Sequence, residues 1–193
     1  MKRLCSFSLF LFAVAASAEP VTGTLKTPAL KRTVQLVYIE KAEGKFPPAA
    51  QPIAINQKGN QFQPHIVPAL VGSKVSFQSE DPELHNVFAR NGTKVLFNRG
   101  QPPKSNFQQE FTQLGPVHLT CNIHREMSAW VVVLQNPYWA VPDATTGEFK
   151  IEGLPPGSYT LRVWGEKLES EMADKKFPLT VGGTQTPIQI AER

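Results

Sequence analysis

The stretch VHLTCNIHREMSAWVVVL, residues 117–134, decides the fold. Its two ends, residues 117–120 and 129–134, are rich in Val and other apolar residues, which is typical of strands buried on at least one face. The eight residues between these ends, 121–128, begin at Cys121 and are mainly polar. The sequence therefore predicts two neighbouring strands joined by a tight loop.

Strand-like segments recur along the rest of the chain. Each is short, contains β-branched or aromatic residues, and is bounded by Gly, Pro, Asn or Asp, which favour turns. With 17 Pro and 13 Gly in the chain, we expect an all-β protein in which Greek-key connections build a β-sandwich. Residues 166–176 are the one candidate helix, and they are too polar to organise a core. The further predicted strands are residues 33–39, 74–77, 94–97, 148–151 and 159–163.

Three potential metal ligands lie in the loop between the strands predicted at residues 117–120 and 129–134. Cys121, His124 and Met127 supply a thiolate, an imidazole and a thioether at a spacing that one tight turn can bring to a single ion. Soft sulfur donors favour copper over magnesium or calcium. The alternatives are a buried structural thiol at Cys121 and simple core packing of Met127.

A second imidazole is expected from a distant strand, because the fold would then fix the geometry of the site. His85 ends the connection formed by residues 81–84 and begins the strand that follows. Two His, one Cys and a weak axial Met make the trigonal copper site of electron-transfer proteins. The alternative for His85 is a turn histidine bonded to the backbone.

Two further histidines, His118 and His65, lie outside this set. His118 comes three residues before Cys121 in the same strand, so its side chain is expected on the opposite face, and it is not assigned as a ligand. His65 follows the first strands of the same region. A surface histidine is the favoured interpretation of His65, with an additional or replacement metal ligand and an electron-entry residue as alternatives.

The pattern of these residues resembles the cupredoxins, the small blue copper proteins of the amicyanin and plastocyanin type. The resemblance covers residues 51–136 and implies one type 1 copper, held by equatorial and axial ligands. It implies that Asn86 ties the two ligand loops together. The equatorial ligands would be His85, Cys121 and His124, and the axial ligand Met127. The motifs that carry the resemblance are Phe62-x-Pro64, Gly72-x-x-Val75-x-Phe77, His85-Asn86 and Cys121-x-x-His124-x-x-Met127.

A second module is expected after the copper domain. Residues 147–161 alternate apolar and charged positions around a Pro-Pro-Gly corner and resemble the carboxypeptidase regulatory-like, or transthyretin-like, β-sandwich. Residues 137–193 are too few to hold such a core alone, so we expect the strands of residues 19–50 to complete it. The cupredoxin domain would then be inserted in this second sandwich rather than simply followed by it. The whole arrangement resembles exported cupredoxins of the methylamine-utilisation type.

The start of the chain has the composition of a secretory signal peptide, which we assign to residues 1–18. Two cations are followed by an apolar run, residues 9–16, that is too short to span a bilayer, and then by small residues. Cys5 would be removed with this segment, leaving Cys121 alone. We therefore expect a periplasmic or secreted protein with no stable membrane insertion. The 20 Lys and Arg are scattered among 16 Asp and Glu, which excludes a nucleic-acid partner.

These features predict a carrier of single electrons and not an enzyme. An oxidase with a trinuclear copper cluster needs many more than the 4 histidines present, and a binuclear copper centre needs a second cysteine in the mature chain. The partners would be redox proteins, such as a dehydrogenase or a cytochrome, met through transient contacts. The alternatives are a copper delivery or sensing module and a structural β-sandwich protein without redox activity.

Overall fold

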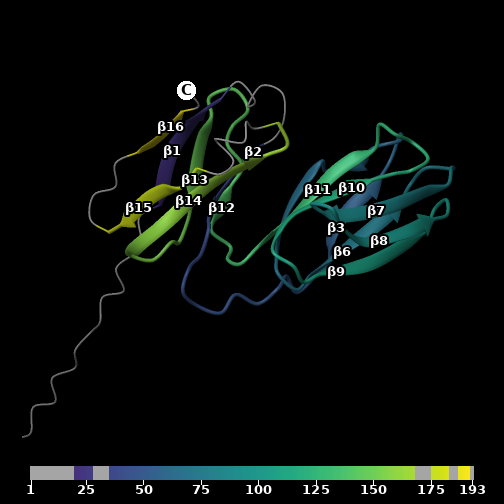
Figure 1. The fold of residues 1–193 in the computed structure, drawn as a ribbon, viewed down its shortest axis with the longest axis horizontal. Helices are drawn as coiled ribbons and strands as arrows, with labels where there is room; N and C mark the ends of the chain where they lie inside the picture. Colours follow the sequence, from purple (N-terminus) through teal and green to yellow (C-terminus); the bar gives the residue numbers. More distant parts are fainter. Residues whose placement is uncertain (1–19, 28–34, 168–174, 183–186, 192–193) are drawn as a thin grey trace, which may run out of the picture.

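The computed structural model describes residues 20–27, 35–167, 175–182 and 187–191, and every regular element in these ranges is a β-strand (Figure 1). The predicted all-β fold is confirmed. The predicted signal peptide, residues 1–18, lies outside the described residues, and so do residues 168–174, which form most of the candidate helix. Within the described ranges there is no helix of the length and apolar character that crossing a bilayer requires.

The strands form two lobes that lie side by side (Figure 1). The first, here called the ligand lobe, pairs its strands in a five-stranded sheet of order β5-β11-β10-β7-β8 and a four-stranded sheet of order β4-β3-β6-β9. Its strands are β3 (Ile53–Gln57), β4 (Phe62–Gln63), β5 (Ile66–Leu70), β6 (Ser73–Ser79), β7 (His85–Asn91), β8 (Lys94–Gln101), β9 (Asn106–Phe111), β10 (Gly115–Thr120) and β11 (Ser128–Leu134).

The other lobe, here called the second lobe, combines strands from both ends of the chain. Its sheets have the orders β13-β1-β16 and β12-β2-β14-β15. These strands are β1 (Val21–Lys26), β2 (Gln35–Ile39), β12 (Trp139–Ala140), β13 (Glu148–Ile151), β14 (Gly157–Gly165), β15 (Phe177–Val181) and β16 (Ile188–Ala191). Within the described residues, β1 and β2 pair with strands that follow the ligand lobe in the chain. This is the pairing that an inserted ligand lobe requires. The domain boundaries at residues 51 and 136 stay a prediction.

The core of the ligand lobe lies between its two sheets. Alternate side chains of β6 are buried, as the two-residue period of a strand demands, and Phe77 stacks on Phe107 with ring centroids 4.9 Å apart. Cys121 and Met127 belong to the same buried cluster. Burying a large apolar side chain contributes about 1.5–3 kcal/mol, so this core holds the loop that carries the potential ligands firmly against the sheets.

A smaller apolar cluster joins the two lobes. It brings Leu36 of β2 against Ile66 of β5 and Val132 of β11, and the rings of Trp130 and Trp164 pack against it. A hydrogen bond lies beside this cluster: the Asn136 side chain donates to the carbonyl of Ile39 over 2.9 Å. The second lobe therefore contacts β5 and β11, two strands of the sheet that also carries His85.

Candidate metal centre

The loop from Cys121 to Met127 is closed by its own backbone. Antiparallel pairing of β10 and β11 ends at Thr120 opposite Ser128, so the loop must reverse the chain within seven residues. The Cys121 N–H donates to the Met127 carbonyl over 3.3 Å, and the Met127 N–H donates to the His124 carbonyl over 3.1 Å. Both sulfur-bearing side chains point into the core, with Cys121 3% and Met127 0% exposed.

His85 reaches the same place from the neighbouring strand. It is the first residue of β7, and β7 pairs with β10 so that Phe88 lies opposite Thr120. His85 therefore extends past the end of β10, toward the loop. Its Nδ1 lies 3.0 Å from Nδ1 of His124, and the ligand atoms of His85, Cys121 and His124 all lie within 4.8 Å of one another. The structure thus brings together three of the four predicted ligands.

Asp81 fixes the orientation of the His85 ring. The His85 Nε2 lies 2.9 Å from Oδ2 of Asp81. In the turn between β3 and β4, the Gly59 amide donates to Oδ1 of the same carboxylate and the Asn60 amide donates to Oδ2. Burial raises the pKa of the Asp81 carboxyl, but the two turn amides and the His85 ring lower it by more, so this pKa lies below its usual range. Because an ionised carboxylate only accepts, Nε2 carries the proton and the lone pair is on Nδ1, facing His124.

His124 occupies the outer side of the group. Its side chain is 21% exposed, whereas that of His85 is fully buried, and its Nε2 lies 3.6 Å from a carboxylate oxygen of Glu83. Both imidazoles therefore direct Nε2 toward a carboxylate and Nδ1 toward the other ring. Two Nδ1 atoms 3.0 Å apart beside a thiol are a donor arrangement that a cation stabilises.

Asn86 connects the two segments that supply the ligands. Its side-chain oxygen accepts the N–H of Asn122 over 2.7 Å, and its amide group donates to the side-chain oxygen of Asn98 over 2.7 Å. Asn86 is 7% exposed. It follows the candidate ligand His85 in the chain, and its partner Asn122 follows the candidate ligand Cys121. The side chain therefore ties the loop after Cys121 to β7 and β8.

The donor set fits copper better than harder ions. One thiolate and two imidazole nitrogens, with a thioether buried in the same loop, form the combination that proteins use for type 1 copper. Calcium and magnesium prefer oxygen ligands, which this group lacks at its centre. The side chains of His85, Cys121 and His124 therefore suit copper by their chemistry.

The structure places His65 and His118 elsewhere. The His65 Nδ1 lies 2.8 Å from the Ser128 carbonyl, and its Nε2 lies 2.9 Å from Oε2 of Glu166. The His118 ring stacks on Trp130 with centroids 4.2 Å apart, and its Nε2 lies 2.9 Å from the Ser128 hydroxyl. Burial, together with the charges of Arg90 and His65, lowers the pKa of His118 against an opposing effect of Glu166.

Asp81 and Glu83 are site residues that sequence reasoning missed. Both lie in the connection before His85, four and two positions ahead of it. An acidic residue close to a histidine ligand is a usable signal, since metal-bound histidines commonly donate their other ring N–H to a carboxylate. The sequence does not reveal that the turn at Gly59 holds the Asp81 carboxylate, because this contact joins segments that are distant in the chain.

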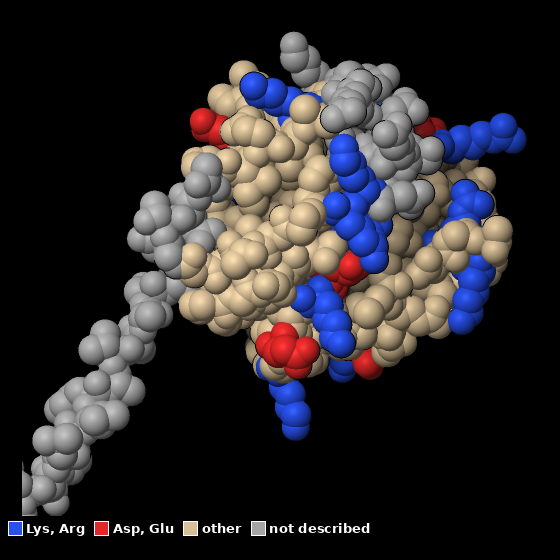
Figure 2. Space-filling view, turned by 60° about the vertical axis from the view of Figure 1, so that its left-hand side comes forward, with Lys and Arg blue, Asp and Glu red and all other residues tan. Residues whose placement is uncertain are grey.

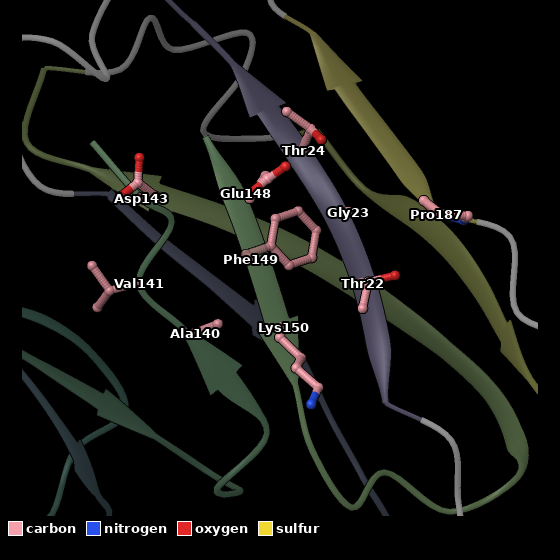
Figure 3. Close-up of a pocket in the computed structure, with 10 residues that line it drawn as sticks. All are labelled: Thr22, Gly23, Thr24, Ala140, Val141, Asp143, Glu148, Phe149, Lys150 and Pro187. Carbon is pink, nitrogen blue, oxygen red and sulfur yellow. The ribbon is translucent and has the colours of Figure 1, made fainter. Parts of the chain in front are cut away.

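A wide hollow of about 840 Å³ lies in the second lobe (Figure 3). Thr22 and Thr24 of β1, Glu148 and Lys150 of β13 and Asp143 line it, and the ring of Phe149 lies against β1 beside Gly23. None of the residues that line it belongs to the group around Cys121. On the face shown in Figure 2, Lys and Arg are spread out and interleaved with a few acidic residues.

Comparisons with known proteins bear on the fold alone. No protein-family model matches the chain, and no curated protein matches it either. Among solved structures, a purple cupredoxin from Nitrosopumilus maritimus is 22% identical, with 42% of this chain and 98% of that chain covered and a TM-score of 0.38. A reduced amicyanin mutant is 21% identical, over 50% of this chain and 97% of that chain, with a TM-score of 0.40.

A copper-containing nitrite reductase from Thermus scotoductus SA-01 is also similar. It is 21% identical, over 50% of this chain but only 25% of the reductase, with a TM-score of 0.42. Likenesses at these values carry no evidence on activity. What this chain does must follow from its own donor residues.

Proposed function

We propose that this chain is a type 1 copper protein that carries single electrons between redox partners. The observation that carries the proposal is the convergence of His85, Cys121 and His124, whose ligand atoms lie within 4.8 Å of one another. Copper bound there would supply the one-electron chemistry, by alternating between Cu(II) and Cu(I). The chain itself would supply a trigonal set of two imidazoles and one thiolate.

Met127 is proposed as the weak axial ligand. It ends the loop that begins at Cys121, its side chain is fully buried, and it shares the core cluster with Cys121. A thioether in this role tunes the redox potential without binding strongly. Because the backbone at Met127 bonds to both Cys121 and His124, the loop sets all three side chains together.

The surrounding residues would keep the ligand geometry similar in both oxidation states. Asp81 holds the His85 ring, and Asn86 holds the loop after Cys121. Ligands that are fixed in this way rearrange little when the charge of the site changes, which favours fast transfer. The partly exposed His124 is the place where a dehydrogenase or a cytochrome would make transient contact.

Two broader parts of the proposal follow from the sequence. We propose that the chain is exported to the periplasm or beyond the cell after removal of residues 1–18, as in exported cupredoxins of the methylamine-utilisation type. We also propose that the second lobe is a carboxypeptidase regulatory-like sandwich. The pairing of β1 with β13 and of β2 with β14 supports it, because one lobe then uses both ends of the chain.

Copper titration of the purified protein tests the central assignment. Adding Cu(II) should give intense visible absorption from thiolate-to-copper charge transfer, saturating at one ion per chain. Cys121→Ser should abolish this absorption. Glu152→Gln is the control and should leave it unchanged, because Glu152 lies in the second lobe and pairs with exposed Lys150. Copper binding that survives Cys121→Ser with the same spectrum would contradict the proposal.

A copper delivery module is the second candidate, favoured by the exposed edge of His124, which an incoming ligand could displace. Slow loss of copper to a chelator, with reversible voltammetry, supports the electron carrier. Rapid transfer of copper to a chelator without reversible voltammetry supports delivery. A protein that binds no copper would be the structural sandwich.

A further inference from the structure

One contact of the second lobe with the ligand lobe runs through the acidic side chain of Glu166, which faces His65. Glu166 directly follows β14 of the second lobe, and His65 directly precedes β5 of the ligand lobe. The Glu166 Oε2 lies 2.9 Å from Nε2 of His65. The side chains are 23% and 40% exposed, respectively, so the pair is partly shielded from solvent.

His65 is in turn attached twice to the beginning of β11. Its Nδ1 donates to the Ser128 carbonyl over 2.8 Å, and its own carbonyl accepts the N–H of Trp130 over 2.8 Å. Ser128 is the residue after Met127, so this attachment begins where the loop ends. The ring faces a carbonyl on one side and a carboxylate on the other, and both groups are acceptors. The two contacts therefore hold the ring between Ser128 and Glu166.

Glu166 faces the ring as an ionised carboxylate. Burial raises the pKa of the Glu166 carboxyl. The hydrogen bond and charge of His65, with smaller contributions from the Trp130 side chain and the charge of Lys167, outweigh it, so the pKa lies below its usual value. The carboxylate thus remains ionised beside the ring. Charge-assisted hydrogen bonds of this kind are stronger and more directional than neutral ones, so Glu166 fixes the plane in which His65 meets Ser128.

A second contact, from Trp164 near the end of β14, also leads to Ser128. Trp164, two residues before Glu166, meets Trp130 edge to face with centroids 5.2 Å apart. Trp130 stacks on His118, whose Nε2 lies 2.9 Å from the Ser128 hydroxyl. The end of β14 therefore reaches Ser128 by two routes, one to its carbonyl and one to its side chain.

We propose that Glu166 and His65 are positioning residues through which the second lobe holds Met127 at the metal centre. The inference rests on the proposed function, because it concerns the axial ligand of that site. Fixing the Ser128 peptide fixes the backbone from which the Met127 side chain extends, and thereby the approach of its thioether. This gives the second lobe a role in the redox potential, although it contributes no ligand.

A double-mutant cycle on the copper-loaded protein tests this route. Glu166→Ala should shift the redox potential and the Cu(II) electron paramagnetic resonance signal in the wild-type background. In a Met127→Leu background the same substitution should have little further effect, because the thioether on which it acts is gone. An equal shift in both backgrounds would mean that Glu166 acts through its charge alone, and no shift in either would mean that it does not act on the site. Either outcome overturns the proposal.

The apoprotein gives a second readout that needs no copper. Glu166→Ala and His65→Ala should each move the backbone amide resonances of Met127, Ser128 and Ala129. Glu152→Gln is the matched control, since Glu152 lies in the second lobe and pairs only with exposed Lys150. Unchanged amide resonances around Met127 in both variants would overturn the proposal even if copper binds, whereas a failure to bind copper would overturn the proposed function and leave this readout intact.

Discussion

The Nδ1 atoms of His85 and His124 lie 3.0 Å apart, although these residues are 39 positions apart in the chain. The ring of His85 is turned into this position by Asp81, whose carboxylate is itself held by the turn between β3 and β4. The turn between β3 and β4, which is distant in sequence from the loop after Cys121, therefore decides which ring nitrogen of His85 faces the metal centre.

Replacing Asp81 should weaken copper binding. Asp81→Ala removes the acceptor that keeps the proton on Nε2 of His85, and losing such a partner typically costs about 10–100-fold in metal affinity. Competition with a chelator measures the change. Glu83→Gln is the control, because its carboxylate is 57% exposed and lies 3.6 Å from His124, and it should have a much smaller effect. Equal losses in both variants would mean that general negative charge, not the orientation of His85, sets affinity.

Replacing Asn86 should destabilise the apoprotein. Asn86→Ala leaves the N–H of Asn122 without its acceptor, and an unsatisfied, partly buried donor costs about 1–3 kcal/mol. Urea denaturation measures the free energy of unfolding. Asn98→Ala removes only the exposed end of the same chain of hydrogen bonds and should cost less. The interpretation fails if the two variants are equally stable.

The pair of Glu166 and His65 should make stability depend on pH in the acidic range. Burial raises the pKa of Glu166, but the hydrogen bond and charge of His65, together with smaller effects of Trp130 and Lys167, lower it below the usual 4.5. A carboxyl with a depressed pKa stabilises the folded state above its unfolded-state pKa, and this contribution is lost as the pH falls through the folded-state pKa.

Glu166→Gln should therefore flatten the fall of Tm between about pH 6 and about pH 3. Glu152→Gln is the control, since its exposed pair with Lys150 contributes little. Parallel Tm curves for wild type and Glu166→Gln over this range would show that the pair adds no stability.

A side chain at Gly23 should destabilise the second lobe. A Cβ there would lie 2.5 Å from the ring of Phe149 and 2.6 Å from the carbonyl of Ile188, and Figure 3 shows that ring against β1. Gly23→Val should cost about 1–3 kcal/mol or more by overpacking, because a backbone carbonyl cannot move aside easily.

Thermal unfolding measures this loss, while the spectrum of the copper-loaded protein should stay unchanged. Gly100→Ala is the matched control, because a Cβ on Gly100 meets nothing within 4 Å. If Gly23→Val changes neither Tm nor unfolding free energy, the placement of β1 between β13 and β16 is wrong.

Much of the fold could be predicted because apolar residues alternate where strands have one buried face. The predicted strands at residues 117–120 and 129–134 fall within β10 and β11. The strand β9 has the sequence NFQQEF, and its polar composition hid it, although Phe107 and Phe111 carry the two-residue pattern. Composition alone underestimates a strand whose outward face is fully polar.

The candidate site could be predicted where its residues are close in sequence. Cys121, His124 and Met127 share one loop, so their spacing is visible directly. The partners of His65 were not predictable in this way, because Glu166 lies 101 positions away and belongs to another lobe. The role of Asp81 likewise depends on the turn at Gly59, 22 positions earlier. Such contacts follow from tertiary packing and leave no local pattern.

X-ray absorption spectroscopy of the copper-loaded protein reports the ligand set of the ion itself. The first coordination shell should contain one short bond to sulfur and two imidazole nitrogens. The sulfur contribution should disappear in Cys121→Ser, and one imidazole should disappear in His85→Ala. A shell of nitrogen and oxygen alone, or one that neither substitution alters, would contradict the claim that His85, Cys121 and His124 hold the same ion.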